Sequence, residues 1–153
     1  MSYDSIVMES PIGMLELQAD QSHLLLVQFL ENDSRGDFYT ENPILLRAQE
    51  QIAEFFKGER REFDIPLKIK GTSFQKDVWN TLQQIPFGET RSYQDVAEAI
   101  QRPKAVRAVG QANKANRFPI IIPCHRVIGK NNTLTGYAGK QVDKKETLLL
   151  LEK

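Results

Sequence analysis

Cys124 and His125 are the residues whose types and spacing most directly suggest covalent chemistry. They stand side by side, and the chain of 153 residues holds one cysteine and two histidines. A cysteine reacts as its thiolate, and a neighbouring imidazole can take the thiol proton. The pair therefore predicts a sulfur nucleophile with its own base. An inert buried cysteine and a Cys-His hydrolase fit the same pair, so the rest of the chain has to decide between them.

The segment before Cys124 is apolar and bounded by prolines. Pro119 and Pro123 enclose a run of isoleucines, and proline forces the residue before it into extended geometry. We expect a short, stiff, buried segment that ends in a turn at Cys124. No metal site is expected, because one cysteine and two histidines cannot easily supply its ligands.

Composition indicates a soluble protein of one full domain or two small ones. No secretory signal or membrane-length apolar run is visible, and a lone cysteine fits a reducing compartment, so we expect a cytoplasmic location. The net charge of zero hides an asymmetry. Residues 1–70 carry 7 basic and 13 acidic residues, whereas residues 71–153 carry 13 basic and 7 acidic residues. A basic half is a pointer to nucleic-acid contact.

Residues 1–70 read as a scaffold domain. Alternating apolar residues on both sides of the turn at 10–13 predict two strands, and the apolar run 24–30 predicts a third. Asn42-Pro43 can begin a helix that ends at Gly58, and residues 63–67 predict a further short strand. The pattern indicates a small antiparallel sheet with one covering helix, and nothing in it suggests chemistry.

Residues 71–153 read as a mainly helical domain, so the fold class is α/β (α+β). Thr72 begins one helix, Ser92 caps a short second helix, and a turn at 101–103 leads to a third helix over about 104–115. Two short helices joined by such a turn are typical of the helix-turn-helix motif of DNA-binding proteins.

The third helix is the candidate DNA-reading element. Its small residues would let it approach a nucleic acid closely, although they fit packing against a neighbouring helix equally well. Lys104, Arg107, Lys114 and Arg117 supply charge for phosphate contacts. Because this helix runs directly into the Cys124 segment, the sequence predicts a reaction with the nucleic acid itself.

Two features follow the cysteine. Gly136-Tyr137-Ala138-Gly139 predicts either a loop whose aromatic ring covers a flat ligand or an ordinary loop with a packed tyrosine. A last helix is expected over 144–153. Glu152 at its end is the first candidate to orient His125, and Glu146 is the second.

Taken together, these motifs resemble the O6-alkylguanine-DNA alkyltransferases, also called methylated-DNA–protein-cysteine methyltransferases. Pro-Cys-His-Arg-Val at 123–127 matches that family's active-site signature. Residues from Gly71 to Tyr137 match densely, whereas the N-terminal half matches only by its sheet-and-helix outline. Ala138 departs from the serine of many members, although its backbone amide can still bind the guanine oxygen.

The resemblance implies DNA repair by a protein that acts once. It implies that a monomer binds double-stranded DNA containing O6-alkylguanine, rotates the damaged base out of the stack and receives the alkyl group on Cys124. His125 would act as base through a water and Glu152 would hold its tautomer. No cofactor is expected, because the lesion is the donor; activity on O4-alkylthymine is left open. A lesion sensor without catalysis is the alternative, but such relatives lack the cysteine.

The resemblance also assigns individual roles. Tyr93 would help to rotate the nucleotide and assist the departing guanine, Arg107 would fill the vacated stack, and Asn116 would link the reading helix to the cysteine. The full predicted set is catalytic Cys124, His125, Glu152 and Tyr93; DNA-binding Arg107, Lys104, Ala105, Ala108, Gly110, Lys114 and Ser92; and, in the base pocket or the structural link, Asn116, Val127, Tyr137, Ala138, Pro119 and Lys144.

Overall fold

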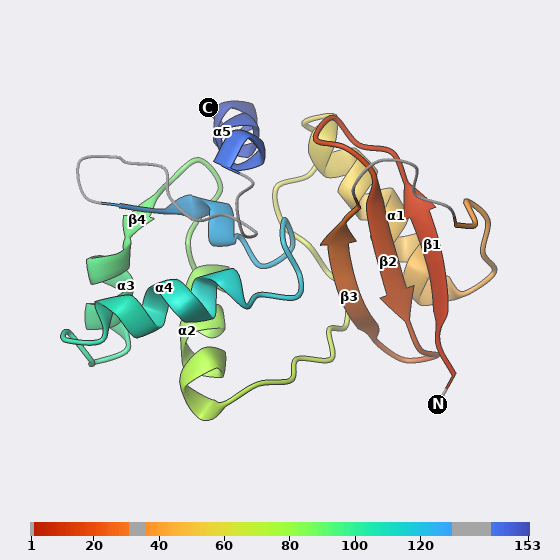
Figure 1. The fold of residues 1–153 in the computed structure, drawn as a ribbon. Coiled ribbons are helices and arrows are strands. Elements are labelled where there is room, and N and C mark those ends of the chain that lie inside the picture. Colours follow the sequence, from red (N-terminus) through yellow and green to blue (C-terminus); the bar gives the residue numbers. More distant parts are fainter. Residues whose placement is uncertain (1, 31–35, 130–141) are drawn as a thin grey trace. The chain divides into compact units, whose positions relative to one another are not determined.

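The computed structural model describes residues 2–30, 36–129 and 142–153, without the side chains of residues 142 and 143. The chain divides into two compact units, Met1–Ile69 and Lys70–Lys153 (Figure 1). Each unit has its own buried core and is described by itself.

The first unit is a three-stranded antiparallel sheet with one helix packed on it (Figure 1). Strands β1 (Asp4–Met8), β2 (Leu15–Ala19) and β3 (Leu24–Phe29) follow one another in the sheet. Alternate residues of β2 are buried under helix α1 (Pro43–Phe56). The Asn42 side chain caps α1 by accepting the backbone N–H groups of residues 44 and 45. The predicted sheet and covering helix are confirmed.

The predicted strand at 63–67 is wrong. Only Leu67 forms a bridge, to Leu24 in β3. The reason lies in a side chain: Gln51 of α1 accepts the N–H of Asp64 at 2.8 Å and donates to the Asp64 carbonyl at 3.2 Å. The backbone groups of Asp64 are therefore already paired and cannot form a ladder with a strand.

The second unit is mainly helical. Its elements are α2 (Ser73–Gln83), β4 (Arg91–Ser92), α3 (Tyr93–Ala99), α4 (Val106–Lys114), the 3₁₀ helix η1 (Cys124–Arg126), β5 (Val127–Ile128) and α5 (Val142–Leu151). Thr72 and Ser92 each form a capping box, with Gln75 and Asp95 respectively. Helices α3 and α4 pack on each other and on α2, and they form the predicted helix pair (Figure 1).

Two contacts tie α4 and the segment after Cys124 to the rest of this unit. Trp79 of α2 donates its indole N–H to the Ala112 carbonyl of α4 at 2.8 Å. Strand β4 pairs in parallel with β5, so that Ser92 lies opposite Ile128. The start of α3 therefore lies beside the strand that leaves the cysteine. The strand pair was not predicted, because a two-residue strand has no periodicity to detect.

Candidate active site

Cys124 begins a tight 3₁₀ turn in the interior of the second unit and is 3% exposed. The backbone just before it is bent sharply: Cys124 N donates to the Ile122 carbonyl at 2.7 Å. Ile120 has φ +78°, which is unusual for a β-branched residue. The predicted apolar segment is thus buried as expected, but it is folded into turns rather than extended throughout.

Two asparagines of the α4 region hold this segment. Asn116 donates to the Ile122 carbonyl at 2.9 Å and accepts from Phe118 N at 2.9 Å. Asn113 donates to the carbonyl of Cys124 itself at 3.4 Å and is 2% exposed. The link between the reading helix and the cysteine, predicted for Asn116, is therefore shared with Asn113, which the sequence analysis did not single out.

Glu152 is the centre of a buried hydrogen-bond network. One carboxylate oxygen, Oε2, lies 2.7 Å from His125 Nε2 and 2.9 Å from Arg126 Nη2. The other, Oε1, accepts from Arg126 Nε at 2.9 Å and from the backbone N–H of Gly88 at 3.2 Å. Glu146, the second candidate, is exposed. The carboxylate beside His125 therefore belongs to Glu152.

The electrostatics of this network fix the proton on His125. Burial opposes ionisation of Glu152, but the hydrogen bonds from His125 and Arg126 prevail and lower the pKa of this carboxyl to about 2. Burial lowers the pKa of His125, and the charges of Arg126 and Lys145 lower it further, against the opposing effect of Glu152. At neutral pH an ionised Glu152 can only accept, so a neutral His125 carries its proton on Nε2.

Lys145 is a further buried charge beside the cysteine. It is 0% exposed, and its Nζ lies 5.8 Å from the centre of the Tyr93 ring. Burial lowers the pKa of Lys145 to about 8, while attraction to the Cys124 thiolate raises it. The prediction had named Lys144, which is half-buried. Helical spacing held the missing signal, since Lys145 and Leu148 are buried on α5 and the buried Glu152 follows directly after the helix ends at Leu151.

All the predicted DNA-binding residues except Ser92 lie on α4 or just before it. Arg107, Ala108 and Lys114 are exposed, and a Cβ built at Gly110 would meet nothing within 4 Å. Lys104 and Ala105 precede the helix, which begins at Val106 rather than at 104. Ser92 and Tyr93 are half-buried at the start of α3. A helix face with small residues and cations is thus open.

The remaining predicted residues lie in two places. Pro119 and Val127 are buried on either side of the cysteine turn. Tyr137 and Ala138, predicted for the base pocket, lie outside the described residues. In the part of the chain that the structure describes, no group of three or more candidate metal ligands occurs, and no helix is long and apolar enough to cross a membrane.

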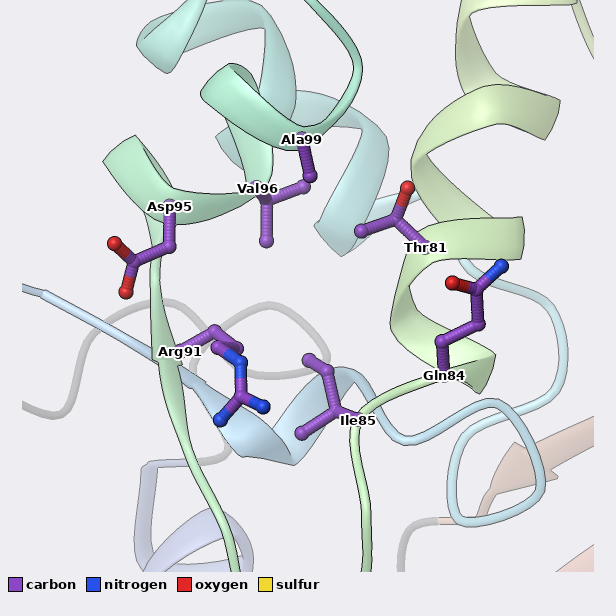
Figure 2. A pocket seen from close by; sticks show the side chains of 7 residues that line it. All are labelled: Thr81, Gln84, Ile85, Arg91, Asp95, Val96 and Ala99. Atoms are coloured by element: carbon purple, nitrogen blue, oxygen red, sulfur yellow. The ribbon is translucent and has the colours of Figure 1, made fainter.

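A pocket of about 520 Å³ occurs in the second unit (Figure 2). Its walls come from the end of α2, β4 and α3, and they include Ile85, Arg91, Asp95 and Val96. Cys124, His125 and Glu152 do not line it. The pocket is therefore not the place where the predicted nucleophile would meet its substrate.

Comparison with known families accounts for almost the whole chain. Residues 73–153 match the family described as 6-O-methylguanine DNA methyltransferase, DNA binding domain. Residues 5–69 match the 6-O-methylguanine DNA methyltransferase, ribonuclease-like domain.

Individual relatives agree with this match. The chain is 47% identical to the constitutive methylated-DNA–protein-cysteine methyltransferase of Bacillus subtilis, covering 95% of this chain and 92% of the relative. It is 48% identical to the methylated-DNA–protein-cysteine methyltransferase of Methanosarcina acetivorans, over 95% and 96%. The crystal structure of Mycobacterium tuberculosis OGT in complex with DNA superposes with a TM-score of 0.86 at 44% identity, over 98% of this chain and 92% of that one.

Proposed function

The chain belongs to the 6-O-methylguanine DNA methyltransferase family, and we propose from this that it repairs DNA by transferring the alkyl group of O6-alkylguanine to its own Cys124. The observation that carries the proposal is the position of Cys124. The cysteine lies next to a buried His125–Glu152 pair and is tied by Asn113 and Asn116 to a helix with an open, basic face. A double-stranded DNA containing the lesion is the partner.

In the proposed reaction the Cys124 sulfur attacks the alkyl carbon. The bond from that carbon to the guanine oxygen breaks, and its electron pair stays on the guanine. His125, neutral and protonated on Nε2, accepts the thiol proton through a water, and Glu152 stabilises the imidazolium that results. The Tyr93 hydroxyl assists the departing guanine. The product is a stable thioether, so one molecule repairs one lesion.

The second unit would supply both recognition and chemistry. Arg107, Lys104 and Lys114 contact phosphates or the vacated stack, while Ser92, Ala105, Ala108 and Gly110 allow close approach to the duplex. Asn116, Pro119 and Val127 would hold the cysteine turn, and the base-pocket role that the family resemblance gives Tyr137 and Ala138 falls outside the described residues. Residues 1–70 act as a scaffold. A working thiolate needs a reducing compartment, so the site of action is the cytoplasm.

The test is incubation with a duplex oligonucleotide that contains one O6-methylguanine, followed by mass spectrometry of peptides. A single methyl increment on the Cys124 peptide is expected, with no further transfer when more lesion is added. Cys124→Ala should bind the duplex and gain nothing. As a matched pair, His125→Gln should slow transfer strongly, whereas His23→Gln, in a turn of the first unit, should not. Normal binding with an unmodified Cys124 would instead support a lesion sensor.

A further inference from the structure

Arg126 is held by four contacts beside the His125–Glu152 pair. Its Nε and Nη2 donate to the two oxygens of Glu152, each at 2.9 Å, in the fork geometry that Arg and carboxylates favour. Its Nη1 donates to the Ile85 carbonyl at 2.7 Å, and its guanidinium lies 5.7 Å from the centre of the Phe87 ring. At 6% exposure, Arg126 is a fixed charge and not a surface residue.

Arg126 and His125 share one carboxylate oxygen. Oε2 of Glu152 lies 2.9 Å from Arg126 Nη2 and 2.7 Å from His125 Nε2. A buried carboxylate alone would favour the imidazolium form of His125, because opposite charges in contact stabilise each other. A cation bound to the same carboxylate opposes that attraction and lowers the pKa of His125. The 3₁₀ turn makes this possible, since it directs two consecutive side chains onto one acceptor.

Resting on the proposed function, we propose that Arg126 is a positioning residue that keeps His125 a neutral base by neutralising Glu152 and fixing its carboxylate in one orientation. The charged groups that act on His125 in the described residues are Glu152, Arg126 and Lys145, and Cys124 acts in turn on Lys145. With Arg126 present, one carboxylate is opposed by two cations. Without Arg126, the unopposed charge of Glu152 at Nε2 would favour the imidazolium form of His125, with both ring nitrogens protonated, and the imidazole could no longer accept the thiol proton.

The test compares the pH dependence of a single transfer to Cys124 in wild type and Arg126→Met. The wild-type rate should fall only at acidic pH, where His125 becomes protonated. This fall in rate on the acid side of the pH profile is the acid limb. In Arg126→Met the acid limb should move to higher pH by about one unit or more, as expected when a neighbouring charge is removed. Arg47→Met is the matched control, because it breaks an exposed Arg–Asp bridge in the first unit and should leave the limb in place.

Two further variants separate the electrostatic role from loss of folding. Arg126→Lys keeps the cation and should keep the wild-type limb, even if the rate falls. Arg126→Met combined with Glu152→Gln removes both charges and should bring the limb back towards the wild-type pH. If Arg126 only supported the fold, adding Glu152→Gln to Arg126→Met would not bring the acid limb back to the wild-type pH.

A measurement that needs no transfer keeps this proposal separate from the repair function. In a His23→Gln background His125 is the single histidine, so NMR titration of its ring nitrogens reads its pKa and tautomer directly. Arg126→Met should raise the pKa of His125. An unchanged or lower value would overturn the proposal, whether or not methyl transfer is observed.

Discussion

Lys145 is a buried cation that weakens the fold while it favours the charged form of Cys124. Burial lowers the pKa of Lys145 to about 8, so that around neutral pH the folded protein holds a charge that the unfolded chain would solvate better. The attraction between Lys145 and the Cys124 thiolate acts in both directions. Lys145 is therefore expected to lower the stability of the fold and to raise the reactivity of Cys124.

These two opposite effects of Lys145 can be separated in the variant Lys145→Met. The variant should unfold at a higher temperature than wild type at pH 7, because a flexible apolar side chain replaces a desolvated charge. Its rate of methyl transfer should fall by about tenfold or more, the effect of roughly one pKa unit in thiolate stability. Thermal unfolding and single-turnover kinetics provide the two measurements. Lys76→Met, at an exposed lysine of α2, should change both much less.

At the residue scale the sequence predicts the reactive group better than the groups that tune it. Cys124, His125 and Glu152 could be found because their types have a defined chemistry. Arg126 and Lys145 could not be separated in this way from ordinary surface cations, since their burial depends on which carbonyl, ring and carboxylate the fold brings to them. Burial of a charged side chain is a tertiary property.

At the scale of an element, the turn between α3 and α4 holds one residue in an unfavourable backbone conformation. Gln101 follows the end of α3 with φ +62°, the left-handed region that glycine adopts most easily. Arg102 N donates to the Ala97 carbonyl and Gln101 N to the Glu98 carbonyl, each at 2.9 Å, so the helix end has the usual hydrogen bonds of a left-handed cap. Gln101 is exposed and gains no burial in return.

Gln101→Gly should therefore stabilise the protein by about 1 kcal/mol, the approximate cost of a left-handed residue with a side chain. Urea unfolding in the absence of DNA measures the change. Gln101→Ala is the matched control, because it also removes the polar side chain but keeps the Cβ, and it should give no such gain. Equal effects of the two substitutions would show that the backbone conformation is not the cause.

Elements that carry their own local signals were predictable, and elements imposed by distant partners were not. The capping boxes at Thr72 and Ser92 follow directly from residue types at fixed spacing. The β4–β5 pair and the positive φ of Ile120 have no local signature. At Asp64, a single glutamine from α1 takes the backbone groups that a strand would have used.

At the scale of the molecule, Glu152 joins segments that lie far apart in the sequence of the second unit. Its carboxylate connects α5 to the cysteine turn through His125 and Arg126, and to the turn after α2 through Gly88 N. Gly88 has φ +84°, and a Cβ there would lie 3.2 Å from the Glu152 carbonyl oxygen. The stability of the whole second unit should therefore depend on the protonation of this one carboxyl.

The sign of that response follows from the two shifted groups. The pKa of Glu152 is lowered from 4.5 to about 2, so Glu152 contributes stability above its unfolded pKa that is lost as pH falls from about 4.5 towards 2. The pKa of His125 is also lowered, from 6.5, so its contribution is complete above pH 6.5 and declines below it. Stability should thus decrease with acidification in two successive stages.

Trp79 makes the prediction measurable within the second unit. It is the single tryptophan of the chain and is 4% exposed, so its fluorescence reports unfolding of this unit. Urea unfolding followed at Trp79 should show wild type losing about 3 kcal/mol through the Glu152 stage, the linkage equivalent of its pKa shift. The stability difference between wild type and Glu152→Gln should shrink over the same pH range, because both then carry an uncharged side chain at position 152. A difference that stays constant down to about pH 2 would mean that packing around residue 152, and not its charge, holds α5 to the cysteine turn.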